Sequence, residues 1–382
     1  MKRILLICIS TICLLSSCTN GGKDDGKGRL QSEENLMRRA NYIEITRYKS
    51  GYRLDITCPW DNQSSLGEFF LYPNSLPIPE ELSNKTVIRT PVQSVIAYSS
   101  TQWSVFLQLG EINRVKGILE SNYTKNKEIK RLVNEGDIKD VGIETQIDTE
   151  KVILLQPDII LYTPYSNTKG EELSDLSGAV MFPFADYLEN HPLGRAEWLK
   201  VIGFLTCRER DTDEWFDNIE KRYDSIRQIC DNVTHRPTVF SDLPFEGQWY
   251  IPGGKSYIAQ IFNDAGADYI WKDNNNTASQ PIDAETVLLK AGNADYWRIM
   301  NSTNAEYSYE LLSKENEMFT YFKSFKDRNV IVCDIQKSAY FEKSQYEPDI
   351  LLKDFVKIFH PELISEDYQP KYFYLLTNAG KR

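Results

Sequence analysis

Hydrophobic and polar residues alternate in three short segments near the start of the chain, at residues 42–45, 52–57 and 68–72. Alternation of this kind predicts β-strands with one buried face, and the Gly- and Asn-containing breaks between the segments predict turns. These segments predict a small β-rich extension over residues 37–86.

After residue 86 the pattern changes to short apolar runs that alternate with helical stripes. Strands that alternate with helices imply a parallel sheet covered by helices. The pattern therefore predicts one α/β lobe over residues 87–190 and a second over residues 233–382.

Two matching segments, one in each predicted lobe, strengthen this interpretation. Each begins with an aspartate that can cap a helix, Asp148 or Asp283. A glutamate follows two residues later, Glu150 or Glu285, and an aliphatic helical stripe then leads into a strand. Two similar lobes enclose a cleft, and that arrangement suits a protein that captures a ligand and hands it on.

Between the lobes, apolar residues recur at helical spacing, first over residues 198–205 and then over 215–230. The second stripe predicts a helix of about twenty residues, roughly 30 Å long, which is enough to bridge two domains. The expected fold class is α/β: two α/β lobes, each a short mainly parallel sheet with flanking helices. A long helical backbone over residues 191–232 joins them, and the small β-rich extension precedes them.

The first residues are typical of an export signal. Lys2 and Arg3 precede an apolar run over residues 4–15, which is too short to span a bilayer stably. The small residues before Cys18 resemble the bacterial lipoprotein signal, in which cleavage before the cysteine accompanies its lipidation. We expect a signal peptide over residues 1–17 and lipidation of Cys18; an ordinary signal with an incidental cysteine is the alternative.

Residues 18–36 are expected to form a flexible tether between the lipid anchor and the folded protein. Within it, Lys23, Asp24 and Asp25 resemble the short acidic signals that direct some Gram-negative lipoproteins to the outer surface. A solvated cluster of linker charges is the interpretation we favour. The expected location is the periplasmic face of a bacterial membrane, with the outer-membrane surface as the alternative.

Composition excludes several classes of function. The chain has 382 residues, a formal net charge of −11 and a pI near 5.0, which disfavours a nucleic-acid partner. His191, His235 and His360 are too few for the zinc and manganese sites that depend on histidine, so we expect no metal and no cofactor. The four cysteines after Cys18 have no CxxC spacing and are expected to be buried thiols, with a disulfide as the alternative.

The order of the motifs resembles that of the solute-binding proteins of ABC importers for ferric siderophores, haem and cobalamin, the class in which a single helix joins two lobes. The stretches that carry the resemblance are residues 95–117, 141–161, 253–269, 283–297 and 349–361. The resemblance implies that a glutamate on each lobe docks onto arginines of the permease, and here those residues would be Glu150 and Glu285. The alternative is that both only stabilise the first turn of their helices.

The ligand cleft is expected where strand ends of both lobes meet. Candidate ligand-binding residues in the first lobe are Ser100, Thr101, Gln102, Tyr123, Tyr162 and Tyr165, and in the second Trp249, Tyr250, Lys255, Tyr257 and Arg298. Aromatic rings suit a large, flat, partly apolar ligand, and the two basic residues could offset the charge of a ferric siderophore or a haem propionate. Core packing is the alternative for the aromatic residues, and a solvated surface for the basic ones.

Together these features predict a monomeric, lipid-anchored solute-binding protein. It would capture an iron chelate (a ferric siderophore or haem) or cobalamin and deliver it to an inner-membrane ABC permease. The alternative is a surface-exposed lipoprotein that captures or senses a ligand without a permease partner. We do not expect an enzyme, because the chain has neither a GxSxG nucleophile elbow nor an HExxH motif.

Overall fold

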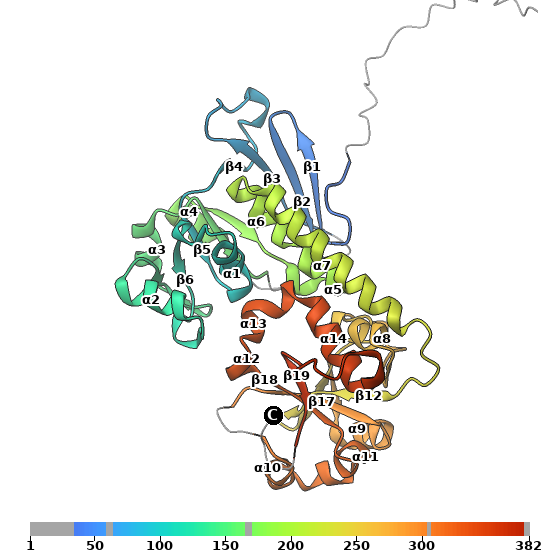
Figure 1. Ribbon diagram of the computed structural model, residues 1–382. Helices are drawn as coiled ribbons and strands as arrows, with labels where there is room; N and C mark the ends of the chain where they lie inside the picture. Colours follow the sequence, from blue (N-terminus) through green and yellow to red (C-terminus); the bar gives the residue numbers. More distant parts are fainter. Residues whose placement is uncertain (1–33, 59–63, 165–169, 304–306, 378–382) are drawn as a thin grey trace, which may run out of the picture. The chain divides into compact units, whose positions relative to one another are not determined.

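The N-terminal extension is a four-stranded sheet in the computed structural model, which describes residues 34–58, 64–164, 170–303 and 307–377 (Figure 1). Strands β1 (Ile43–Tyr48), β2 (Gly51–Thr57) and β3 (Ser65–Pro73) pair antiparallel, which confirms the three predicted strands. Strand β4 (Val87–Thr90) pairs with β3 in parallel. Residues expected to open the first lobe therefore complete the sheet of the extension.

The first lobe is built on a parallel sheet in the order β11-β10-β5-β6-β7. Its strands are β5 (Val95–Ala97), β6 (Val115–Ile118), β7 (Lys139–Asp140), β10 (Ile159–Tyr162) and β11 (Val180–Pro183). Its helices are α1 (Ser100–Gln108), α2 (Lys127–Glu135), α3 (Thr149–Leu155) and α4 (Gly170–Ser177). Both faces of the sheet are buried: Ile160 packs with Val152 and Leu173, whereas Ile159 and Leu161 belong to the main core.

Three consecutive helices connect the lobes: α5 (Pro192–Glu197), α6 (Leu199–Thr206) and α7 (Glu209–Cys230). Helix α7 has 22 residues, about 33 Å of helix, which confirms the long connecting helix. It buries Phe216, Ile219 and Tyr223 at three- and four-residue spacing and packs against α6 and against α14 (Pro348–Phe359).

The second lobe has a five-stranded sheet in the order β15-β12-β17-β18-β19, in which only the last strand is antiparallel. Its strands are β12 (Thr238–Ser241), β15 (Asp268–Tyr269), β17 (Tyr296–Asn301), β18 (Val330–Asp334) and β19 (Phe373–Leu375). Its helices include α8 (Tyr257–Asp264), α9 (Ala284–Ala291), α12 (Ile335–Ser338) and α13 (Tyr340–Lys343). A small antiparallel sheet contains β13 (Pro244–Phe245), β14 (Gln248–Ile251) and β16 (Gln280–Asp283). These two helix-flanked sheets confirm the α/β class.

Two buried carboxylates anchor the segment that leads into β1. Glu197 accepts hydrogen bonds from the backbone N–H groups of residues 38–40 at 2.6–3.0 Å. Glu189 accepts from the N–H groups of residues 41 and 42 and from the indole of Trp198, at 2.9–3.1 Å. The main hydrophobic core also continues from Ile45 of the extension into both lobes. The extension is therefore an integral part of the folded unit.

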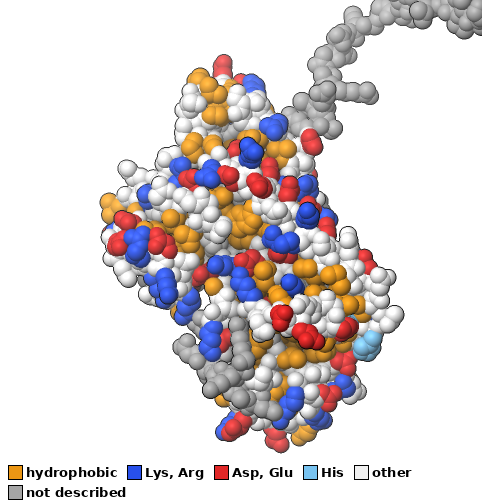
Figure 2. All heavy atoms as spheres, viewed as in Figure 1, with side chains coloured by type: hydrophobic (Ala, Val, Ile, Leu, Met, Phe, Trp, Pro, Cys, Tyr) orange, Lys and Arg blue, Asp and Glu red, His pale blue; other side chains and the backbone are white. Residues whose placement is uncertain are grey.

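Many charged side chains of the described residues form ion pairs. On the face in Figure 2, acidic and basic side chains are intermingled rather than gathered in one patch. Ion pairs such as Arg131 with Glu128 on α2, at 2.7 Å, illustrate this pairing.

Cys207 is exposed and Cys58, Cys230 and Cys333 are buried, and all four are free thiols. Within the described parts of the chain, no helix is both long and apolar enough to cross a membrane.

Candidate ligand-binding site

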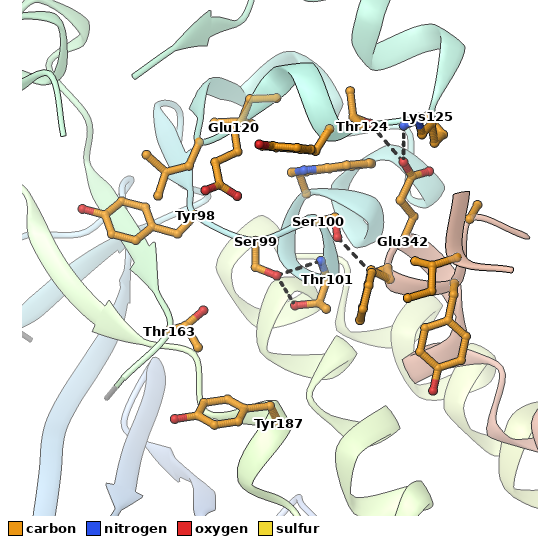
Figure 3. A pocket seen from close by; sticks show the side chains of 18 of the residues that line it. Tyr98, Ser99, Ser100, Thr101, Glu120, Thr124, Lys125, Thr163, Tyr187 and Glu342 are labelled. Atoms are coloured by element: carbon orange, nitrogen blue, oxygen red, sulfur yellow. Dashed lines mark hydrogen bonds between the residues drawn. The ribbon is translucent and has the colours of Figure 1, made fainter. Parts of the chain in front are cut away.

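A cavity of about 570 Å³ lies where the strand ends of the first lobe face the segment after β18 (Figure 3). Its first-lobe wall contains the turn between β5 and α1, the loop over residues 118–125, and Thr163 just beyond β10. Its second-lobe wall contains Ser302 and residues of α12 and α13. The volume is within the range of small-molecule sites in proteins.

The turn between β5 and α1 is fixed by a capping box. The Ser99 hydroxyl accepts a hydrogen bond from the backbone N–H of Thr101 at 3.2 Å, and the Gln102 side chain accepts from the backbone N–H of Ser99 at 3.1 Å. This cap holds Ser99, Ser100 and Thr101 at the cavity wall. The Ser100 hydroxyl in turn donates to the backbone carbonyl of Phe341 at 3.0 Å, across the cavity wall.

Glu342, on α13, forms the second connection between the two walls. One of its carboxylate oxygens accepts from the hydroxyl of Thr124 at 3.0 Å and from the backbone N–H of Lys125 at 2.9 Å (Figure 3). The same oxygen accepts from the backbone N–H of Asn126 at 3.2 Å. All three donors belong to the first lobe. Because three donors of one wall converge on one oxygen of the other, this contact helps to set the distance between the walls.

A largely buried cation lines the cavity. Arg195, on α5, donates to Asp186 at 3.2 Å, and its guanidinium carbon is 4.9 Å from the ring centre of Tyr257. Burial opposes the charge of Arg195, but Asp186 and the nearby Tyr257 and Tyr340 hydroxyls carry its pKa above the ordinary value. The guanidinium therefore stays charged at neutral pH and offers a positive group to an anionic or polar part of a ligand.

Two further carboxylates line the cavity. Glu120 and Glu144 line the cavity, and partial burial together with repulsion from Glu120 raises the pKa of Glu144. Beside them, burial and the Glu144 charge raise the pKa of Tyr98, so this phenol stays protonated at neutral pH. The described wall thus combines hydroxyl groups, aromatic rings and charges of both signs.

Three of the predicted ligand-binding residues of the first lobe line the cavity: Ser100, Thr101 and Tyr123, of which Tyr123 is 75% exposed. Gln102 is fully buried, and its side chain caps α1 instead. Tyr162 ends β10 but is not part of the wall, where its neighbour Thr163 lies. Tyr165 lies outside the described residues.

The residues predicted in the second lobe lie elsewhere, and these expectations are corrected. Trp249 is fully buried among aromatic rings that include Trp297, and its indole donates to the Ser241 carbonyl at 2.9 Å. Arg298 is 5% exposed and donates to the partly exposed carboxylate of Asp242 at 2.6 Å, so its charge is already paired within the protein. Tyr250, on β14 of the small antiparallel sheet, and Lys255, in the loop after it, are exposed and are not among the residues that line the cavity.

Tyr257 reaches the site indirectly, through its contact with Arg195 and a 3.4 Å contact between its hydroxyl and that of Tyr340. Sequence reasoning missed Arg195 and Glu342. Ligands bind beyond the carboxyl ends of parallel strands, and α12 and α13 directly follow β18, so Glu342 could have been predicted. Nothing in the pattern around Arg195 distinguishes it from a surface residue.

The two predicted docking glutamates occupy equivalent places. Glu150 is the second residue of α3 and Glu285 the second residue of α9, and both side chains are exposed. The predicted aspartate caps are confirmed: Asp148 and Asp283 accept from the backbone N–H three residues on, at 3.1 and 2.8 Å. Docking by the glutamates stays a prediction.

Among the described residues, no group of three or more His, Cys, Asp or Glu side chains is arranged to hold a metal ion. His191 caps α5 by accepting from the N–H of Leu193, and His360 contacts the Gly266 carbonyl at 3.1 Å.

Residues 95–336 match the family model for periplasmic binding proteins. The chain belongs to this family. The resemblance to the solute-binding proteins of ABC importers is thereby confirmed, and family members bind solutes rather than catalyse reactions.

Relatives of this periplasmic binding protein include lipoproteins. It is 28% identical to the uncharacterized lipoprotein MJ0878 of Methanocaldococcus jannaschii over 397 residues, covering 95% of this chain and 94% of the relative. It is 21% identical to the ferric-anguibactin-binding protein FatB of Vibrio anguillarum, over 60% of this chain and 72% of that one. Among solved structures, a periplasmic heme binding protein from Pseudomonas aeruginosa has a TM-score of 0.58 at 15% identity, covering 75% of this chain and 98% of that one. This last likeness shows the fold alone.

Proposed function

We propose that this periplasmic binding protein is a lipid-anchored carrier that captures an iron chelate or haem, or alternatively cobalamin. It delivers the ligand to the permease of an ABC importer. The observation that carries the proposal is the 570 Å³ cavity between residues of the two lobes, because a site closed by both lobes can release its ligand when they separate.

The chemistry of the wall supports a large ligand with an aromatic or conjugated face. Tyr123 and Phe341 expose rings at the cavity, at 75% and 54% exposure, and Arg195 adds a positive charge to its wall. Iron chelates, haem and corrinoids all combine an extended surface with a few polar groups. The FatB relationship favours an iron chelate over cobalamin.

Anchoring at Cys18 and docking through Glu150 and Glu285 complete the proposal. The lipoprotein relatives support the anchor. The matched positions of the two exposed glutamates support docking, since two separated carboxylates orient a basic partner better than one. In this proposal the protein works as a monomer at the periplasmic face of the membrane.

Tryptophan fluorescence of the purified protein tests the proposed cargo, because Trp103 lines the cavity. The protein is titrated with a ferric hydroxamate, a ferric catecholate, haemin and cyanocobalamin, and we expect saturable quenching by one of them. Tyr123→Ala should weaken that binding by about tenfold, which corresponds to about 1.4 kcal/mol, a reasonable value for one lost aromatic contact. Tyr321→Ala, which removes a 56% exposed tyrosine outside the cavity wall, is the control. Absence of quenching by all four compounds would remove the proposed cargo.

A further inference from the structure

The matched segments share more than their acidic residues. Each has the sequence Asp-x-Glu-x-Val-aliphatic-Leu, running from Asp148 to Leu154 and from Asp283 to Leu289. In both, the aspartate caps the helix and the valine is fully buried. The two segments therefore occupy the same helical register, and their other positions can be compared one by one.

The leucine at the end of each segment is exposed. Leu154 is 81% exposed and Leu289 is 86% exposed, the two highest values among the large hydrophobic side chains of the described residues. A single exposed leucine is unremarkable in a folded protein. Two at the same position of a repeated segment, one in each lobe, call for a common cause.

Each leucine lies on the same helix face as its glutamate. Leu154 follows Glu150 by four residues and Leu289 follows Glu285 by four, and side chains at this spacing lie one turn apart on one face. Each lobe thus presents a carboxylate and an apolar side chain side by side. Neither α3 nor α9 contributes to the wall of the ligand cavity, so these leucines do not contact the ligand there.

We propose that Leu154 and Leu289 are two equivalent apolar contacts for the importer permease, each inserted beside the basic group that meets the neighbouring glutamate. This inference rests on the proposed function and adds the residues that give docking its affinity. Charge complementarity identifies the partner: a carboxylate at each point requires a basic surface. The repetition requires a partner with two similar surfaces, as a permease built from two related subunits has.

The glutamates and the leucines would contribute to docking in different ways. Exposed carboxylates attract and orient a basic partner over a distance but contribute little net affinity at contact. An exposed leucine contributes affinity once water is excluded from it. The glutamates then set the orientation of the complex, and the leucines lengthen its lifetime.

Photo-crosslinking with the full-length protein in its own cells tests the proposal. p-Benzoylphenylalanine is placed at position 151 or 286, next to each glutamate, and crosslinked proteins are identified by mass spectrometry. We expect both reporters to crosslink to membrane-spanning subunits of an ABC importer. Adding Leu154→Ser to the first reporter, or Leu289→Ser to the second, should lower the yield by about tenfold, since each removes one buried apolar side chain from the complex.

Leu176→Ser and Phe245→Ser are matched controls, because these side chains are also exposed, at 54% and 65%, one in each lobe. They should leave the yield unchanged, and all four variants should keep the thermal midpoint of the parent. Yields that fall no further in the leucine variants than in the controls would overturn this inference and leave the proposed function standing. A leucine-dependent crosslink to a second copy of the chain would overturn the choice of partner. Failure of both reporters to reach any importer subunit would count against the proposed function itself.

Discussion

A single carboxylate oxygen of Glu342 connects the two walls of the ligand cavity, because it alone accepts the three hydrogen bonds from residues 124–126. Glu342→Ala should lower the free energy of unfolding by about 1–3 kcal/mol, since the Thr124 hydroxyl and the Lys125 N–H lose their acceptor and the Asn126 N–H keeps only Thr124 Oγ1 at 3.3 Å. Glu342→Gln keeps a carbonyl oxygen at that place and should cost clearly less. Urea unfolding of both variants measures the difference. Equal losses would show that the charge, and not the acceptor position, stabilises this contact.

The individual residues of the site were predictable from the sequence only in part. Ser100, Thr101 and Tyr123 follow from the rule that parallel strands end at the binding edge of a sheet. Trp249 and Arg298 could not be separated from site residues by sequence, because their type is the same whether they meet a ligand or a buried partner. Their burial depends on Ser241 and Asp242, which only the three-dimensional structure brings beside them.

Among the helices, α5 depends on a titratable cap. The ring nitrogen Nδ1 of His191 accepts from the N–H of Leu193 at 3.1 Å, and burial lowers the pKa of His191 below its ordinary value of 6.5. Above that value the neutral ring stabilises the folded state fully. His191 has the higher pKa in the unfolded chain, so the unfolded chain takes up the proton first as the pH falls below 6.5. The contribution of the His191 cap to the free energy of unfolding is then lost.

Replacement by a cap that does not titrate isolates this effect. Asparagine is a good N-terminal cap, so His191→Asn should keep α5. The unfolding free energy of the natural protein should then fall relative to that of His191→Asn between about pH 7.5 and about pH 5.5. Denaturant unfolding at both pH values measures this, and identical pH dependence of the two proteins would contradict it.

Helices with an apolar stripe were predictable, as α3, α7 and α9 show, and α3 and α9 also have the predicted aspartate caps. The four-residue helices α12 and α13 were not, because one turn is too short to display a helical period. These short helices carry the second-lobe wall of the cavity. The pattern therefore predicted the scaffold of the second lobe but not its contribution to the site.

For the molecule as a whole, the N-terminal extension is held by buried groups rather than by a linker. Glu197 is fully buried and accepts the N–H groups of residues 38–40, whereas Glu220 pairs with the partly exposed side chains of Arg38 and Arg39. Glu197→Ala should lower the free energy of unfolding by about 3 kcal/mol, because three backbone donors and the buried Lys200 lose a partner. Glu220→Ala should cost less than about 1 kcal/mol, as expected for a solvent-accessible ion pair.

Limited proteolysis with trypsin distinguishes these two outcomes, since the enzyme cleaves after Arg38 and Arg39 when their backbone is released. The natural protein and Glu220→Ala should resist cleavage there, and Glu197→Ala should be cut well before the lobes are digested. Equal resistance of the two variants would mean that the side-chain ion pairs hold the segment. Rapid cleavage in Glu197→Ala would instead show that the extension stays attached through a carboxylate of the helical connector, so an event that disturbs α5 also loosens the sheet of the extension.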